Sequence, residues 1–384
     1  MCIRDSRAIV VDRTLSWNNQ GYGSHAERGI LTRTATEWYF AEGATHSGFA
    51  LFYLIQNPNT TDAIVEVRYL RPPPAAALTK TYTVRAQSRF NIWVNDEAVT
   101  DPNLASLAAT DVSVVMRSTN AVPIIAERAL YKDLPGQTFG IGHESAGVTA
   151  PSTSWFLAEG ATGSFMDMFV LLANPNNTAA QVTVDYLLPG GQLSKSYTVD
   201  ANSRYNIWVD LEEFPDGSGN RALADTAVSA TVTSTNGIPI IVERSMYWPG
   251  PSFADWKEAH NSPGSTVTGT RWAVAEGETG GARSTETYVL VANTSAFAGQ
   301  VKATVLFEDG SPAVEKTFPA LAAKSRFNIV PAADFPTTAG KRFGMIVESI
   351  GGSPIQIVVE RAMYSNADGV VWAAGTNALA TRLQ

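Results

Sequence analysis

The stretch Trp155-Phe156-Leu157-Ala158-Glu159-Gly160-Ala161-Thr162 decides how the chain is organised, because it occurs three times. The other copies are Trp38–Thr45 and Trp272–Thr279, and the tryptophans at 38, 155 and 272 are 117 residues apart. A period of this length matches a whole domain rather than one turn of a solenoid. The sequence therefore predicts a tandem array of self-contained modules.

The composition excludes several classes of function. A net charge of −8 over 384 residues argues against nucleic acid or anionic lipid as a partner. No run of about 18 apolar residues is present, so we expect no membrane span. The only cysteine, Cys2, lies in Met1–Ser6, which resembles translated adapter sequence and is left out of the reasoning on the fold. We expect no disulfide, no cysteine-based metal site and no cofactor.

Short alternating segments predict the fold class. In the second module, Gln181–Tyr186 and Tyr205–Val209 alternate with a period of two residues, and Asn174–Thr178 has the composition of a turn. No segment has a sustained helical period. We therefore expect an all-β fold of three tandem β-sandwich modules, immunoglobulin-like, with about seven strands each.

The segment Ile9–Trp17 matches Ile240–Trp248, which closes the second module, so we interpret it as the last strand of a module whose body is missing. The remaining boundaries follow from the 117-residue period. The predicted division is residues 1–37 for the non-native start, stray strand and linker, 38–131 for module 1, 132–154 for a linker, 155–248 for module 2, 249–271 for a linker, 272–364 for module 3 and 365–384 for a C-terminal cap.

Four motifs recur together: Trp-x-x-Ala-Glu-Gly, Asn-Pro-Asn, Ser-Arg-Phe-Asn-Ile and Glu-Arg-Ala-Met-Tyr. In this combination the chain resembles an uncharacterised family of tandem β-sandwich repeats in secreted or surface-attached bacterial proteins. The resemblance covers nearly the whole chain from Arg7 on. It implies a secreted or cell-surface location and, as partners, upstream domains of the same parent chain. It brings no catalytic residues.

Two functions from different classes remain open. The first is a non-catalytic structural array that acts as a spacer or stalk. The alternative is an adhesin or carbohydrate-binding array whose partners are cell-surface glycans or proteins. An enzyme is the least favoured interpretation, because no metalloprotease, nucleophile-elbow or phosphate-loop motif is present.

Strand parity predicts the ion pairs. In the last strand of module 3, Arg361 shares a face with the apolar residues, and Glu360 points the other way. A charge on a core face needs a partner, and the repeated acid of Ala-Glu-Gly is available. The predicted core pairs are Glu42 with Arg128, Glu159 with Arg244 and Glu276 with Arg361. On the opposite, solvated face we expect Glu127 to meet Arg89, Glu243 to meet Arg204 and Glu360 to meet Arg326.

The same parity places an arginine, an asparagine and a tryptophan in one row on a strand. These candidate ligand-binding rows are Arg89, Asn91 and Trp93 in module 1, and Arg204, Asn206 and Trp208 in module 2. A partly exposed row of this kind could stack on a sugar ring. The structural alternative is that the arginine and the linker cover the tryptophan, and Val330 in module 3 weakens the sugar interpretation.

The remaining candidates have structural alternatives that we favour. His25, His143 and His260 lie one per linker, and we expect each to hydrogen-bond its linker onto a module rather than to bind metal or sense pH. The loop Asp216–Asn220 only faintly suggests calcium and is interpreted as a surface loop. The possible glycosylation sequences that begin at Asn59, Asn176 and Asn293 are interpreted as turns.

Overall fold

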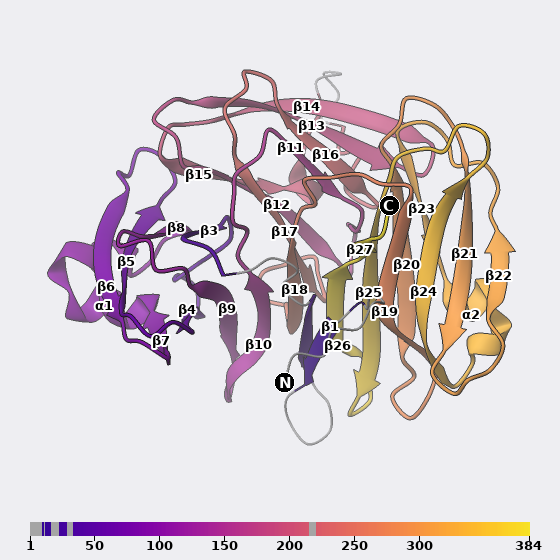
Figure 1. The fold of residues 1–384 in the computed structure, drawn as a ribbon, viewed down its shortest axis with the longest axis horizontal. Helices are drawn as coiled ribbons and strands as arrows, with labels where there is room; N and C mark the ends of the chain where they lie inside the picture. Colours follow the sequence, from indigo (N-terminus) through magenta and orange to yellow (C-terminus); the bar gives the residue numbers. More distant parts are fainter. Residues whose placement is uncertain (1–9, 11, 17–22, 29–33, 215–219) are drawn as a thin grey trace.

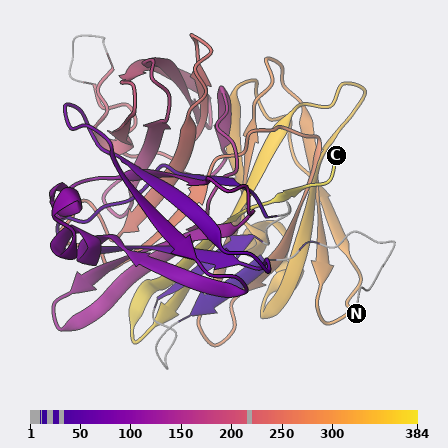
Figure 2. The same ribbon diagram turned by 60° about the vertical axis from the view of Figure 1, so that its left-hand side comes forward.

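The computed structural model describes residues 10, 12–16, 23–28, 34–214 and 220–384. These residues form an all-β structure of antiparallel sheets with a few short helices. Figure 1 shows the sheets arranged around a common middle, and Figure 2 shows them after a 60° turn that brings residues 34–146 forward. No helix among the described residues is long and apolar enough to cross a membrane.

Two facing sheets form what we call the first sheet pair, at the left of Figure 1. One sheet has the order β3 (Glu37–Phe40), β8 (Ser113–Ser118), β5 (Ala63–Leu70), β6 (Leu78–Val84). The other has the order β10 (Gln137–Ala146), β9 (Ile125–Leu134), β4 (Phe49–Asn57), β7 (Ser88–Trp93). The helices α1 (Val94–Thr100) and η1 (Pro102–Leu107) follow β7.

The second sheet pair, at the top of Figure 1, repeats this strand order. Its sheets are β11 (Ser154–Leu157), β16 (Ser229–Ser234), β13 (Ala180–Leu188), β14 (Gly191–Val199), and β15 (Ser203–Trp208), β12 (Asp167–Asn174), β17 (Ile241–Trp248), β18 (Glu258–Pro263). The short helix η2 (Val209–Leu211) follows β15.

The third sheet pair, at the right of Figure 1, has the same order with one added edge strand. Its sheets are β22 (Val314–Thr317), β21 (Gln300–Phe307), β24 (Lys341–Ile350), β19 (Arg271–Thr279), β27 (Thr381–Arg382), and β23 (Ser325–Ile329), β20 (Glu286–Asn293), β25 (Ile357–Ala367), β26 (Val370–Leu379). The helices are α2 (Pro331–Asp334) and η3 (Pro336–Thr338).

The repeated stretch forms the centre of each core. Trp38, Trp155 and Trp272 are fully buried between their two sheets. Each indole Nε1 donates to a backbone carbonyl, of Ile124 at 3.0 Å, Ile240 at 2.9 Å and Ile357 at 3.0 Å. A buried indole needs such an acceptor. The repeated tryptophan therefore joins the two sheets of its pair.

The glycine of Ala-Glu-Gly is required by a close backbone approach. A Cβ at Gly43 would lie 2.5 Å from the carbonyl oxygen of Val112, and one at Gly160 would lie 2.3 Å from that of Val228. The same close approach allows Val112 N–H to donate to the Gly43 carbonyl at 2.8 Å. Any other residue would push these strands apart.

The predicted linkers and cap are wrong. Segments 132–154 and 249–271 contain β10 and β18, and segment 365–384 contains β26 and β27. The strands β10, β18 and β26 each pair with the strand before them. Their inward side chains include buried polar residues such as His143 and Asn261, so no apolar alternation marks them as strands. Their burial depends on polar partners, which are Glu42 of the same sheet pair for His143 and Arg128 of another sheet pair for Asn261.

The predicted stray strand also has a partner. Part of it forms β1 (Asp12–Ser16), which pairs with β2 (Ser24–Arg28) as a hairpin. Contacts then close a circle of inner strands: β10 touches β18, β18 touches β26, β26 touches β2, and β2 touches β10. The sequence predicts modules in a row, with this strand left from a module whose body is missing. The structure instead packs the sheet pairs around these inner hairpins.

A buried asparagine explains the Asn-Pro-Asn turns. Asn57, Asn174 and Asn293 are fully buried. The Asn174 amide donates to the carbonyls of Thr178 at 2.8 Å and Val199 at 3.0 Å, and its Oδ1 accepts from Asn176 N–H at 3.0 Å. Asn176 Nδ2 also donates within the protein, to Pro239 O at 2.7 Å. These contacts agree with the turn interpretation of the sequon at Asn176.

Asn174→Ala should lower the free energy of unfolding by about 2–3 kcal/mol, because one buried and two partly buried carbonyls lose their donor. Asn177→Ala, at the exposed tip of the same turn, is the matched control and should change it by less than about 0.5 kcal/mol. Urea melts of both variants measure the difference. Similar losses for the two would show that the Asn174 amide is not the element that holds the turn.

Candidate functional site

The structure brings together the three core pairs expected from parity. Arg128 Nη2 lies 3.2 Å from Glu42 Oε2, and Arg244 Nη2 lies 2.7 Å from Glu159 Oε2. Arg361 Nη2 lies 3.3 Å from Glu276 Oε2. The first two pairs are buried, whereas the Glu276 side chain is 40% exposed. Each pair joins the Ala-Glu-Gly stretch to the strand of the same repeat that carries the Glu-Arg motif, which is β9, β17 or β25.

The three outer-face pairings are wrong. Glu243 is fully buried and meets Arg128 of the first sheet pair, with Arg128 Nη1 2.5 Å from Glu243 Oε2. It also accepts from the backbone N–H groups of Ala41 at 3.0 Å and Glu42 at 3.1 Å. Parity assigned Glu243 to the correct side of its strand. The neighbouring sheet pair, not solvent, covers that side.

The same contact recurs at the next boundary. Glu360 of the third sheet pair lies 2.6 Å from Arg244 Nη1 of the second and accepts from Ala158 N–H at 2.8 Å. We call the boundary between the first and second sheet pairs the first junction, and the boundary between the second and third the second junction. At each, one arginine lies between two buried carboxylates that belong to different repeats.

Arg204 of the predicted ligand row, and Arg326 at the matching position of the third sheet pair, make contacts at the junctions. Arg204 Nη1 donates to Gly43 O at 3.1 Å, and Arg326 Nη1 donates to Gly160 O at 3.0 Å. Both arginines are buried. The row Arg204, Asn206 and Trp208 is therefore not an open sugar platform: Asn206 and the half-buried Trp208 line the first junction beside Arg204.

The row on the first sheet pair is different. Arg89 and Asn91 are exposed, and Trp93 is 45% exposed and stacks on Phe52 with a ring separation of 5.4 Å. Arg89 Nη2 donates to Asn91 Oδ1 at 3.1 Å. The arginine of this pattern is thus buried in the second sheet pair and exposed in the first.

The histidines point at the buried acids. His143 Nε2 lies 3.4 Å from Glu42 and His260 Nε2 lies 3.2 Å from Glu159. His25 lies 3.6 Å from Glu144, and burial, Arg13 and His143 lower its pKa to about 4. Among the described residues, no group of three or more His, Cys, Asp and Glu could hold a metal. Residues 216–219 of the suggested calcium loop lie outside the described residues.

Glu42 and Glu159, the acids of the Ala-Glu-Gly stretches, are ionised at neutral pH. Burial would raise the pKa of Glu42, but His143 and Arg128 outweigh it and hold the value at about 2. Glu159 has a pKa of about 2 because His260 and Arg244 outweigh its burial. These two acids therefore carry true charges, which are costly to leave unpaired in an interior, whereas burial raises the pKa of Glu360.

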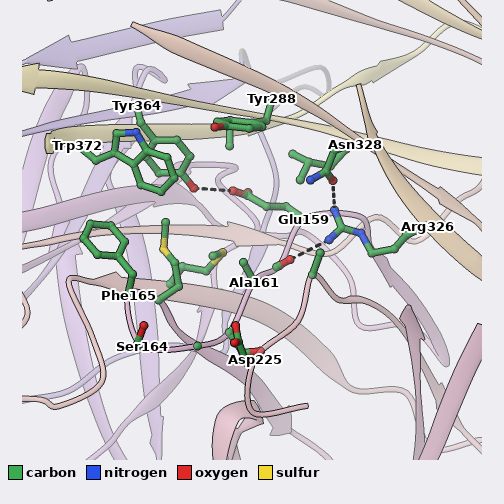
Figure 3. A pocket seen from close by; sticks show the side chains of 18 of the residues that line it. Glu159, Ala161, Ser164, Phe165, Asp225, Tyr288, Arg326, Asn328, Tyr364 and Trp372 are labelled. Carbon is green, nitrogen blue, oxygen red and sulfur yellow. Dashed lines mark hydrogen bonds between the residues drawn. The ribbon is translucent and has the colours of Figure 1, made fainter. Parts of the chain in front are cut away.

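A pocket of about 480 Å³ opens at the second junction. Figure 3 shows Tyr364 and Trp372 at one side of it and Arg326 with Asn328 at the other. Tyr364 and Trp372 stack with ring centroids 4.4 Å apart, and Phe165 meets Trp372 edge-on at 5.5 Å. Aromatic walls with a few fixed polar groups are typical of small-molecule sites.

The first junction has a smaller pocket, of about 230 Å³, in the matching place. Phe253 and Trp256 line it together with Trp208. At the second junction, Val330 stands where the first junction has Trp208. Trp372 stacks on Tyr364 there, as Trp256 stacks on Tyr247 at the first junction. These substitutions leave more space at the second junction.

The charge of the second pocket also differs. Arg204 lies 3.3 Å from Asp111 at the first junction, whereas the residue equivalent to Asp111 at the second junction is Ala227. Burial lowers the pKa of Arg326 to about 10, and no carboxylate of the described residues lies within ion-pair distance of it. The walls of this pocket come from two repeats, so no single stretch of sequence indicates it.

Beside this pocket, Asp210 accepts backbone hydrogen bonds from Gly163 at 3.2 Å and Met168 at 2.9 Å. Burial raises the pKa of Asp210 to about 6. The first sheet pair has Asn95 in the same position, and it accepts from Leu51 N–H at 2.9 Å. An amide therefore suits this place without carrying a charge.

Asp210→Asn should stabilise the protein at pH 8 by about 1–2 kcal/mol and have little effect at pH 4. A pKa raised from 3.8 to about 6 means that stability is highest when the carboxyl is protonated and declines as pH rises through 6. Thermal melts at both pH values test this. Asp200→Asn on an exposed loop is the control, and an equal gain at both pH values for Asp210→Asn would contradict the assignment.

Comparisons with known proteins give only weak likenesses. No family model and no curated protein matches the chain. Thermotoga maritima 1070 is similar over 30% of this chain and 94% of its own, at 14% identity and a TM-score of 0.26. The Anabaena sensory rhodopsin transducer is similar over 25% of this chain and 96% of its own, at 27% identity and a TM-score of 0.20. At these TM-scores neither likeness supports a conclusion about function.

Proposed function

We propose that the chain is a non-catalytic structural array of three immunoglobulin-like β-sandwich repeats in a secreted or cell-surface bacterial protein. The observation that carries this proposal is the same buried contact at both junctions, Glu243 with Arg128 and Glu360 with Arg244. An array whose repeats share buried charges behaves as one rigid body. We therefore propose a compact display scaffold instead of an extended stalk of independent modules.

Limited proteolysis tests the scaffold. Modules on flexible linkers would be cut near residues 136–147 and 249–269 and would leave module-sized fragments. Because those segments contain β10 and β18, residues 34–384 should resist cutting there. The double variant Glu243→Lys, Glu360→Lys should become cleavable at these segments, since it places one lysine against each of the buried arginines Arg128 and Arg244. Ready cleavage of the unaltered chain would contradict a rigid scaffold.

A second candidate is binding of an acidic sugar at the second junction, and the pocket of about 480 Å³ favours it. Tyr288 and Trp372 offer ring faces for a sugar, and Arg326, which lacks the carboxylate that Arg204 has, offers a cation to a carboxylate ligand. This moves the carbohydrate hypothesis from the strand row to the pocket.

Titration calorimetry with glucuronic acid and with neutral glucose tests this candidate. Binding should favour the acid, and Ala161→Phe, which fills the pocket, should abolish it. Trp93→Ala on the exposed row is the control and should leave binding unchanged. Binding that is lost with Trp93→Ala and kept with Ala161→Phe would restore the strand row as the site.

A further inference from the structure

One face of the first sheet pair is uncovered, although its equivalents are buried. Leu171, Arg204 and Glu243 of the second sheet pair are 4%, 1% and 0% exposed. Leu290, Arg326 and Glu360 of the third are 5%, 1% and 0% exposed. At the matching positions of the first sheet pair, Arg89 is exposed and Leu54 and Glu127 are only partly buried.

The covered faces show what covers them. At the first junction, Leu171, Ala173 and Ile241 pack against an apolar patch of the preceding repeat that consists of Tyr39, Ala41, Leu70 and Val115. The junction thus has two halves: a receiving face on the later repeat and an inserting patch, with Ala-Glu-Gly at its centre, on the earlier one.

The inserting patch of the third sheet pair is uncovered too. Leu70 and Leu187 are fully buried at their junctions, whereas Leu306 in the equivalent place on β21 is 45% exposed. The Glu276 side chain is 40% exposed, whereas the side chains of Glu42 and Glu159 are 5% and 2% exposed. One receiving face and one inserting patch therefore remain open at opposite ends of the same array.

The β1–β2 hairpin lies between these two open surfaces and makes the junction contacts of a fourth repeat. Thr14 Oγ1 donates to Glu276 Oε2 at 2.6 Å, as the hydroxyl of Ser245 donates to Glu42. Arg13 lies 3.8 Å from Glu127, in the role that Arg128 has toward Glu243. The hairpin also touches both β10 and β26, which closes the inner circle.

We propose that the space between the third and first sheet pairs is the docking site of a fourth repeat of the same type, which completes a closed ring. Its Ala-Glu-Gly stretch covers Leu54, Gln56 and Glu127, and its own receiving face covers Leu306. A pocket of about 830 Å³ lined by Arg13, Arg89 and Glu127 marks the half of the site on the first sheet pair. The occupant is recognised by the same Glu–Arg chemistry that both described junctions use.

An extended chain tests the proposal. Residues 150–239 are placed directly before residue 9, so that β1 and β2 take the places that β17 and β18 have in the second sheet pair. Cys2 is the only cysteine, so Cys2→Ser with Gln56→Cys gives one thiol on the receiving face. Its labelling by a maleimide should slow at least about tenfold in the extended chain relative to the original chain.

Two controls make the result specific. Thr83→Cys, exposed on β6 of the same sheet pair, should label equally in both chains. The change Leu187→Lys in the inserting patch of the added copy alone should restore fast labelling at residue 56, while circular dichroism shows that the protein stays folded. Equal labelling at residue 56 in the original and the extended folded chains would overturn the proposal. Concentration-dependent protection of the original chain, with a dimer mass by light scattering, would overturn it in favour of a second copy.

Discussion

Replacing Arg244 with alanine should lower the free energy of unfolding by about 3–5 kcal/mol, because it leaves two buried carboxylates without their cation. Arg244 is fully buried, 2.7 Å from Glu159 and 2.6 Å from Glu360. It also donates to the Glu159 carbonyl at 3.2 Å. The loss should affect the second and third sheet pairs together, since the two acids belong to different repeats.

The shift in the urea midpoint measures this effect. Arg117→Ala is the matched control, because that arginine also pairs with a glutamate, Glu37 at 2.7 Å, but is 59% exposed. Arg117→Ala should lower the free energy of unfolding by about 0–1 kcal/mol. The triple variant Arg244→Met, Glu159→Gln, Glu360→Gln should recover part of the stability, since it leaves no unpaired charge. Equal losses for Arg244→Ala and Arg117→Ala would contradict the buried network.

Acid should destabilise the protein strongly between pH 4.5 and pH 2. Glu42 and Glu159 have their pKa lowered from 4.5 to about 2. A carboxyl whose pKa is lowered by folding stabilises the protein at pH values above its unfolded-state pKa. That stabilisation is lost as the pH falls through its folded-state pKa. Protonation of each of these two carboxyls should lower the free energy of unfolding by about 3 kcal/mol. His25, with its pKa lowered from 6.5 to about 4, adds a loss of similar size in the same direction between those two pH values.

Calorimetric melting temperatures from pH 7 to pH 2.5 test this prediction. Glu258 acts in the opposite direction, because burial raises its pKa well above 4.5, so its contribution declines as pH rises. Glu42→Gln should melt lower at pH 7 and show a flatter decline toward pH 2.5 than the unaltered protein. A variant curve parallel to that of the unaltered protein would show that Glu42 is not among the groups that acid titrates.

The sequence was sufficient to predict the strands with apolar alternation and the ion pairs within a repeat. It was insufficient to predict the contacts between repeats. Alternation located strands such as β13 and β15, and parity paired Glu159 with Arg244. Parity also assigned Glu243 to the opposite face, but a two-residue period cannot tell whether water or another repeat covers that face. The same limit explains why polar strands such as β10 were predicted as linkers.

Because each junction uses one acid from one repeat and one arginine from another, every repeat carries both halves of the same connector. Repeats built in this way are interchangeable: any copy that keeps its Ala-Glu-Gly stretch and its Glu-Arg strand can follow any other. Copies can therefore be shuffled or duplicated without redesign of the boundaries. The two junctions differ in a few side chains. Asp111 and Trp208 at the first junction correspond to Ala227 and Val330 at the second.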